Sequence, residues 1–188
     1  MSLEGGVRGE SGGQKLGSEG GSSGSEGAKV SLGGSAVDAQ GSGLRIDAID
    51  SSWPRLGEVE ELIYGILYRD FGVARDDGWR QPVDEGSAFV ALDDDVLVGY
   101  AILLGGAGDA ERQLRQMAVA SEVRRRGVGR ALVGRLEEDA RASGTGLIWL
   151  NARETAIAFY ERLGYSCVGD MFVSELTKIP HRPMKKHT

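Results

Sequence analysis

Residues 114–133 constrain the fold more than any other stretch, because the spacing of their apolar side chains changes halfway along. Residues 117–119 form a continuous apolar run, which is typical of a buried strand. Gly127 and Gly129 follow, and a glycine allows a positive φ angle or the close approach of another molecule. Beyond them, apolar side chains recur at helical spacing, at Val128, Ala131, Leu132, Leu136 and Ala140. The stretch therefore predicts a strand, a short turn and a helix.

Four arginines crowd the predicted start of this helix: Arg124, Arg125, Arg126 and Arg130. A helix N-terminus carries about half a positive charge and normally favours Asp or Glu, so this arrangement is unfavourable unless an anion is present. Free backbone N–H groups, glycines and surplus arginine together favour a phosphate-binding site. The alternative interpretation is a solvated basic loop that caps a core helix. The sequence has neither the third glycine of a dinucleotide fingerprint nor the Gly-Lys-Ser/Thr of a P-loop.

The first part of the chain differs in composition from the rest. Residues 1–43 are rich in Gly, Ser and Glu and show no hydrophobic period, so we expect a disordered leader that is not a secretory signal. Residues 44–188 have a globular composition and are long enough for one domain.

Composition also excludes several classes of function. The single cysteine, Cys167, rules out an intramolecular disulfide and a cysteine-rich zinc site, and we expect no metal. A formal net charge of −6 disfavours nucleic acid as a partner. No apolar run reaches membrane-spanning length. We therefore expect a soluble, cytoplasmic protein, monomeric or homodimeric, without a membrane or nucleic-acid partner.

The order of the predicted elements indicates an α/β (α+β) domain with a mixed sheet and helices on both faces. Asn151, with Glu154 three residues later, resembles a capping box, so we expect a helix that begins there and ends at Gly164. The three adjacent carboxylates at 93–95 indicate a hairpin turn. The other predictions are a helix at 56–67 and strands at 44–48, 87–92, 96–104, 112–119, 146–150, 165–168, 171–176 and 182–185.

Two segments resemble signatures of the GCN5-related N-acetyltransferase (GNAT) family. Residues 124–129, Arg-Arg-Arg-Gly-Val-Gly, match its Arg/Gln-x-x-Gly-x-Gly/Ala signature, and the run Gln-Met-Ala-Val at 116–119 is similar to its fourth strand. Residues 151–165 resemble its Asn-x-x-Ala-x-x-Phe-Tyr-x-x-x-Gly-Phe/Tyr segment, which follows the fifth strand. The resemblance implies the family fold, a mostly antiparallel mixed sheet in which the fourth and fifth strands splay apart.

The resemblance implies acetyl-CoA as co-substrate in that cleft. The backbone N–H groups of residues 126–131 would hold the pyrophosphate, and Met117 and Val119 would pair through their backbones with the pantetheine arm and the thioester carbonyl. Asn151 would touch the cofactor, a role compatible with capping its helix. The full cofactor-binding set that the resemblance implies is Met117, Ala118, Val119, Arg124, Arg125, Arg126, Gly127, Val128, Gly129, Arg130, Ala131 and Asn151.

Tyr160 corresponds to the tyrosine that acts as general acid in the family, and its alternative role is a core aromatic. The sequence does not mark the general base. Glu111 and Glu122 flank the fourth strand. A histidine is the side chain that ordinarily titrates near neutrality, so His181 is a third candidate, with a structural role as its alternative. His181 lies in an Ile-Pro-His segment that is similar to the end of some bacterial members.

The implied reaction is direct attack on the thioester by a primary amine of a small molecule or peptide. The alternative function is a catalytically silent sensor or interaction module that binds CoA or acyl-CoA on the same fold.

Overall fold

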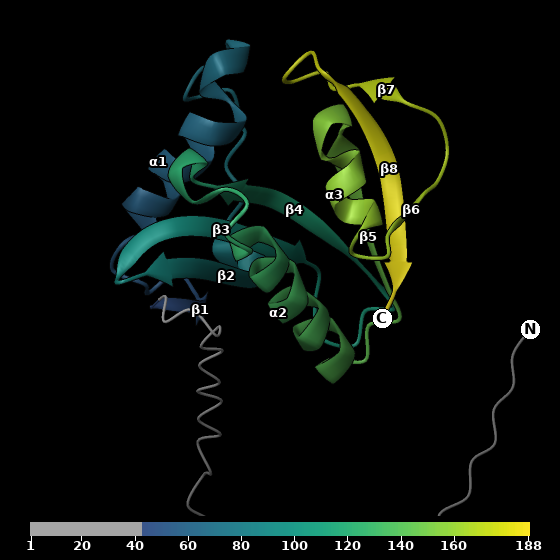
Figure 1. The fold of residues 1–188 in the computed structure, drawn as a ribbon, viewed down its shortest axis with the longest axis horizontal. Coiled ribbons are helices and arrows are strands. Elements are labelled where there is room, and N and C mark those ends of the chain that lie inside the picture. The colour runs from purple at the N-terminus through teal and green to yellow at the C-terminus, as the bar shows by residue number, and fades with distance from the viewer. Residues whose placement is uncertain (1–42) are drawn as a thin grey trace, which may run out of the picture. The chain divides into compact units, whose positions relative to one another are not determined.

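The computed structural model describes residues 43–188 (Figure 1). The predicted disordered leader, apart from Gly43, lies outside the described residues. Within them, no helix is both long and apolar enough to cross a membrane. The helices are α1 (Leu56–Leu67), α2 (Val128–Ala142) and α3 (Ile157–Glu161). The strands are β1 (Leu44–Ile49), β2 (Gly86–Asp93), β3 (Val96–Leu104), β4 (Glu111–Val119), β5 (Leu147–Arg153), β6 (Ser166–Cys167), β7 (Phe172–Val173) and β8 (Pro180–His187).

The strands form one sheet in the order β1-β2-β3-β4-β5-β8-β6, with β7 also paired to β8. All neighbours run antiparallel except β4 and β5, which are parallel. The three aspartates at 93–95 lie in the β2–β3 turn, where Asp94 and Asp95 have φ angles of 48° and 68°. The predicted mixed, mostly antiparallel sheet and the hairpin turn are therefore confirmed.

The parallel pair separates after a short contact. Only Glu111–Gln113 of β4 pair with Leu147–Trp149 of β5, although both strands continue further. Beyond Gln113, β4 has no partner strand on its β5 side among the described residues. Beyond Trp149, β5 pairs with β8 alone. The splayed central pair that the resemblance implied is present, and it opens a gap in the middle of the sheet (Figure 1).

Helices cover both faces of the sheet, with α1 on one face and α2 and α3 on the other (Figure 1). A separate hydrophobic core lies on each face. The core beneath α2 and α3 includes Leu132 and Leu136, which are fully buried, and the inward residues of β4 and β5 such as Leu114 and Leu150. The core beneath α1 packs Ile63 and its neighbours against β2 and β3. Side chains alternate along a strand, so the residues next to Leu114 in β4 and next to Leu150 in β5 point to the opposite face of the sheet, which α1 covers.

The region after residue 150 departs from the sequence prediction. Asn151 does not cap a helix but lies inside β5, opposite Pro183 of β8. A short 3-10 turn, Glu154–Ala156, precedes α3, whose N-cap residue is Ala156. The capping-box prediction was wrong because pairing with β8 extends the strand through Arg153 and overrides the local preference. The strand predicted at 171–176 is also shorter, only Phe172–Val173.

Gly164 stops the chain after α3 in a left-handed conformation, as predicted, although the helix itself already ends at Glu161. Gly164 has a φ of 89°, and its N–H donates to the Glu161 carbonyl at 2.9 Å. The N–H of Tyr165 donates to the Tyr160 carbonyl at 3.1 Å. Such a left-handed residue satisfies the last helical carbonyls, and glycine adopts it without strain.

Candidate active site

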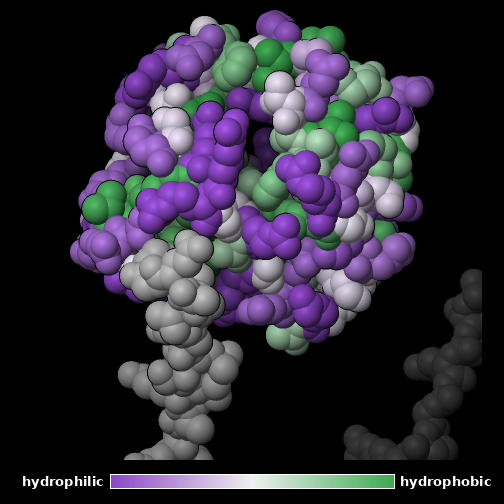
Figure 2. Space-filling model, viewed as in Figure 1, coloured by the Kyte–Doolittle hydropathy of each residue, from purple (hydrophilic) through white to green (hydrophobic). Residues whose placement is uncertain are grey.

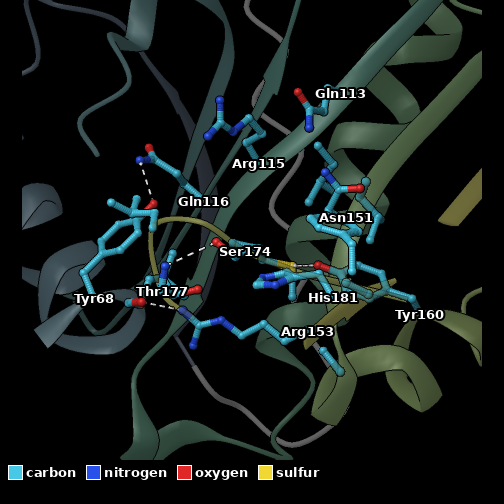
Figure 3. A pocket seen from close by; sticks show the side chains of 18 residues that line it. Tyr68, Gln113, Arg115, Gln116, Asn151, Arg153, Tyr160, Ser174, Thr177 and His181 are labelled. Atoms are coloured by element: carbon cyan, nitrogen blue, oxygen red, sulfur yellow. Dashed lines mark hydrogen bonds between the residues drawn. The ribbon is translucent and has the colours of Figure 1, made fainter. Parts of the chain in front are cut away.

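A cleft of about 450 Å³ lies between the separated ends of β4 and β5. Residues 113–117 of β4 and 150–153 of β5 form its walls, and Tyr160 of α3, Tyr68 after α1 and His181 of β8 also line it (Figure 3). Figure 2 shows the surface hollowed between the part of the domain that carries α1 and the part that carries α3 and β8. The cleft therefore lies where the interruption of sheet pairing exposes strand backbone.

A β-bulge bends β4 at the cleft. The register with β3 shifts between Tyr100 and Ile102, and Gln116 has a φ of 50°, which is unusual for a residue other than glycine. The buried Gln116 side chain holds this geometry, since its Nε2 donates to the Trp79 carbonyl at 2.6 Å. The bulge changes the direction of β4 just before Met117, a feature that no local sequence pattern predicts.

Tyr160 is both a core residue and a cleft residue. It is 6% exposed, and its ring packs edge-on against Phe159 and Tyr165 with centroids 5.0 and 5.6 Å apart. Its hydroxyl donates to the Met117 Sδ at 3.6 Å (Figure 3). Burial raises the pKa of Tyr160 above its ordinary value, so the phenol keeps its proton. The two interpretations of this residue from the sequence are thus compatible.

The first turn of α2 presents free backbone donors. Gly127 precedes the helix with a φ of 87°, no side chain caps the helix, and its first turn contains no acidic residue. Among the described residues, the N–H groups of residues 127–130 have no acceptor. The N–H of Arg126 donates to Val123 and that of Ala131 donates to Gly127. Of the donors expected at residues 126–131, those of residues 127–130 are therefore free for a ligand among the described residues, and those of Arg126 and Ala131 have acceptors within the protein.

The arginines around this turn differ in their partners. Arg126 lies 3.1 Å from a carboxylate oxygen of Asp93, which ties the loop to the β2–β3 turn. Arg124, Arg125 and Arg130 are exposed, and no carboxylate of residues 43–188 lies within ion-pair distance of them. Within the described part of the chain, three cations beside four N–H donors without acceptors make this turn a site of unbalanced positive potential.

Gly129 has a packing role in addition to any role in ligand access. A Cβ atom there would lie 3.3 Å from Phe159 Cζ and 3.4 Å from Met117 Cε. The absence of a side chain therefore lets the first turn of α2 approach α3 and β4 closely. A Cβ atom at Gly127, in contrast, would have nothing within 4 Å, so this glycine serves the left-handed backbone.

Two further cleft residues, Arg153 and His181, face each other across β5 and β8. His181 Nδ1 lies 3.0 Å from the Ile179 carbonyl, and its ring stacks on Phe172. Burial lowers the pKa of His181, the Ile179 contact opposes that shift, and the charge of Arg153 adds to it. The other two residues considered as bases from the sequence, Glu111 and Glu122, do not line the cleft.

Comparison with known proteins identifies the family. Residues 53–165, more than half of the chain, match the model of the acetyltransferase (GNAT) family. The chain belongs to this family. A curated relative, an uncharacterized protein of Mycobacterium leprae, is 42% identical over 80 residues, which are 40% of this chain and 21% of that protein. The chain thus matches about a fifth of the length of this relative.

Solved structures of other GNAT proteins share the fold. An aminoglycoside 6'-N-acetyltransferase complexed with coenzyme A aligns over 76% of this chain and 96% of its own, with a TM-score of 0.63 and 22% identity. An acyl-CoA N-acyltransferase from Pseudomonas aeruginosa covers 76% and 99%, with a TM-score of 0.64 and 19% identity. FeeM, an N-acyl amino acid synthase from uncultured soil microbes, covers 78% and 91%, with a TM-score of 0.65 and 13% identity.

Proposed function

We propose that this GNAT protein transfers an acetyl group from acetyl-CoA to a primary amine of a small molecule or peptide. The observation that carries the proposal is the position of Met117, which joins the cleft to the first turn of α2. Met117 lines the cleft, accepts the hydrogen bond of Tyr160, and lies 3.4 Å from a Cβ position at Gly129. Among the described residues, the N–H groups of residues 127–130 in that turn have no acceptor. We call the α2 turn and its loop, residues 117–131, the cofactor side. The α1 face of the cleft is the acceptor side.

The cofactor side fits the phosphates of acetyl-CoA. The N–H groups of residues 127–130 would hold the pyrophosphate, and the exposed Arg124, Arg125 and Arg130 would balance its charge. Beyond Gln113, the β5-facing edge of β4 has no partner strand within residues 43–188, so the backbone near Met117 and Val119 is available to an extended pantetheine arm. Asn151 lines the cleft from β5, where its exposed amide can reach the same arm.

The position of Tyr160 fits a hydrogen-bond donor to the departing sulfur. Its hydroxyl already donates to a sulfur atom, that of Met117, and a thiolate is a stronger acceptor than a thioether. As the amine attacks the thioester carbon, the C–S bond breaks and Tyr160 donates to the thiolate, acting as general acid. The raised pKa of the buried phenol keeps this donor protonated at neutral pH.

His181 is our candidate for the base that removes the proton of the attacking amine. Its Nδ1 lies against the Ile179 carbonyl, an arrangement that suits Nδ1–H as donor and leaves Nε2 without a partner among the described residues, so that it can accept a proton. Its lowered pKa keeps the ring neutral at pH 7. For a neutral amine the protons then balance: His181 gains the proton that the attacking nitrogen loses, and Tyr160 loses the proton that the thiolate gains. Transfer of one proton from His181 to Tyr160 through solvent restores both groups for the next turnover.

Release of free CoA from acetyl-CoA, measured across a panel of amines, tests the proposal. We expect thiol release that depends on both the enzyme and an amine. Calorimetric titration with CoA is measured in parallel. Tight CoA binding without turnover of any amine would favour the silent sensor module instead, and absence of CoA binding would contradict both functions.

A further inference from the structure

The charges on the acceptor side indicate the class of acceptor. We propose that the acceptor amine carries an anionic group, a carboxylate or phosphate, which Arg115 and Arg153 bind. This inference rests on the proposed acetyltransferase activity and names the substrate class of the same site.

The cleft contains no acidic side chain from the described residues. The charged residues that line it are Arg115 and Arg153, with His181 as a further titratable group, and no Asp or Glu is among them. The chain as a whole has the opposite balance, with 28 acidic and 22 basic residues. A cleft that is positive in an acidic protein attracts anions and repels cations. A polycationic acceptor, such as a polyamine, would need carboxylates that this cleft lacks.

Both arginines lie on the opposite face of the sheet from α2, whose first turn is proposed to hold the coenzyme phosphates. Their strand neighbours Leu114 and Ala152 belong to the core beneath α2 and α3. Because side chains alternate along a strand, Arg115 and Arg153 point to the α1 face. Figure 3 shows them on separate strands around the cleft. Their charges are therefore available to the acceptor rather than to the coenzyme phosphates.

Two contacts hold the Arg153 side chain in place and leave some of its N–H groups without an acceptor among the described residues. Its Nη2 donates to the Leu67 carbonyl at the end of α1, and its guanidinium stacks 4.6 Å from the Phe71 ring centre. Arg153 is half-buried, burial lowers the pKa of its guanidinium, and within residues 43–188 it has no ion pair. A carboxylate or phosphate on the acceptor would compensate that charge, and Nε and Nη1 remain available to donate to it.

Arg115 lies on the opposite wall of the cleft, in β4. Its Nη1 donates to Gln81 Oε1 at 3.3 Å, in the loop between α1 and β2, and no carboxylate of the described residues pairs with it. A neutral amide leaves the arginine charge uncompensated, so a ligand anion can bind without displacing a carboxylate. Arg115 and Arg153 thus offer two positions, one on each wall of the cleft, at which the acid group of the acceptor can bind.

Matched pairs of amines that differ only in the acid group test the inference. The pairs are β-alanine with β-alaninamide, O-phosphoethanolamine with ethanolamine, and a peptide that begins Ala-Glu-Glu with one that begins Ala-Gln-Gln; spermidine is the cationic probe. For at least one pair we expect kcat/KM for CoA release to favour the anionic member by about tenfold or more. The pair that shows this preference tells whether the acid group belongs to a small carboxylic acid, a phosphate ester or a peptide. Equal or better turnover of the neutral members or of spermidine would overturn the inference.

Variants that remove a positive charge test whether Arg115 and Arg153 cause the preference for an anionic acceptor. Arg115→Gln should raise the KM for the anionic member and reduce its advantage over the neutral partner by about tenfold. Arg153→Lys, which keeps the charge, should retain more of that advantage than Arg153→Gln. Arg141→Gln, which removes an exposed arginine at the end of α2, is the control and should keep the full advantage. An undiminished advantage in both Arg115→Gln and Arg153→Gln would contradict the assignment.

A binding experiment separates this inference from the proposed activity. The melting temperature of the CoA-loaded protein is measured with each pair at equal concentration. We expect at least one anionic member to stabilise the wild type more than its neutral partner, and Arg115→Gln to remove the difference. If no amine is acetylated but this difference is present, the proposed activity fails and the anion site remains. If turnover occurs without any preference in rate or melting temperature, the anion site fails.

Discussion

The cofactor side comes from one continuous segment, residues 117–131, of which Met117 lines the cleft, whereas the acceptor side is assembled from parts far apart in the chain. The acceptor side takes Arg115 from β4, Arg153 from β5 and His181 from β8, and it reaches across to Tyr68 after α1. The cofactor side presents mainly backbone N–H groups, while the acceptor side presents side chains. The difference indicates that cofactor binding depends on local backbone geometry and acceptor choice on tertiary structure.

The largest expected effect is on kcat, and it comes from Tyr160, which lies between the cofactor side and the acceptor side. Tyr160→Phe removes only the hydroxyl and keeps the ring packing, so kcat should fall on the order of a hundredfold or more while acetyl-CoA affinity changes little. Steady-state kinetics at saturating acetyl-CoA and calorimetry measure the two quantities. Full turnover in the variant would remove Tyr160 from the mechanism and make it a core aromatic only.

The next effect tests the acceptor side through its pH dependence. His181→Gln should lower turnover at pH 7 by about a hundredfold, since general base catalysis is lost. Burial and Arg153 lower the pKa of His181, so protonation of this base should reduce activity only below about pH 6.5, in addition to the loss that protonation of the amine acceptor causes at higher pH. His187→Gln, on an exposed position of the same strand, is the control. An unchanged rate in His181→Gln would leave solvent as the base.

A smaller effect isolates the cofactor side. Gly127→Asp adds a carboxylate beside the free N–H groups and should weaken CoA binding by about tenfold, as measured by calorimetry. Gly127→Asn is the matched control, because it has the same shape and the same cost at φ 87° but no charge. Equal losses in the two variants would show that backbone strain, not repulsion of phosphate, limits binding. The KM for the amine should not change in either.

The smallest effect compares two glycines of α2. Gly134 has open space around a Cβ position, so Gly134→Ala should raise the free energy of unfolding by about 0.5–1 kcal/mol. Gly129→Ala should gain less or lose stability, because its Cβ meets Phe159 and Met117. Denaturant unfolding measures both. An equal gain at the two positions would mean that Gly129 is not needed for packing.

The same contrast explains what the sequence could predict. The strand, turn and helix around Gly127 follow from periodicity and glycine placement within a few residues, and they were predicted correctly. The splay of β4 from β5 came from the family resemblance rather than from residue patterns. Register, and with it the bulge at Gln116, depends on pairing with β3 and had no local signal.

The failures have one physical cause. Asn151 and Glu154 have the spacing of a helix start, but β8, which lies about thirty residues later, pairs with Asn151 and keeps it in a strand. Arg153 and His181 are ordinary residues in the sequence and become neighbours only through the same pairing. The Ile-Pro-His segment was the one sequence signal for His181.

Backbone amide NMR during a CoA titration tests the central claim, that the first turn of α2 holds the coenzyme phosphates. The amides of Gly127, Val128, Gly129 and Arg130 have no acceptor among residues 43–188, and we predict that they show the largest downfield shifts and gain protection from hydrogen exchange. Amides at the other end of α2, such as Gly144, should not change. Saturable CoA binding that leaves residues 127–130 unshifted would contradict the account.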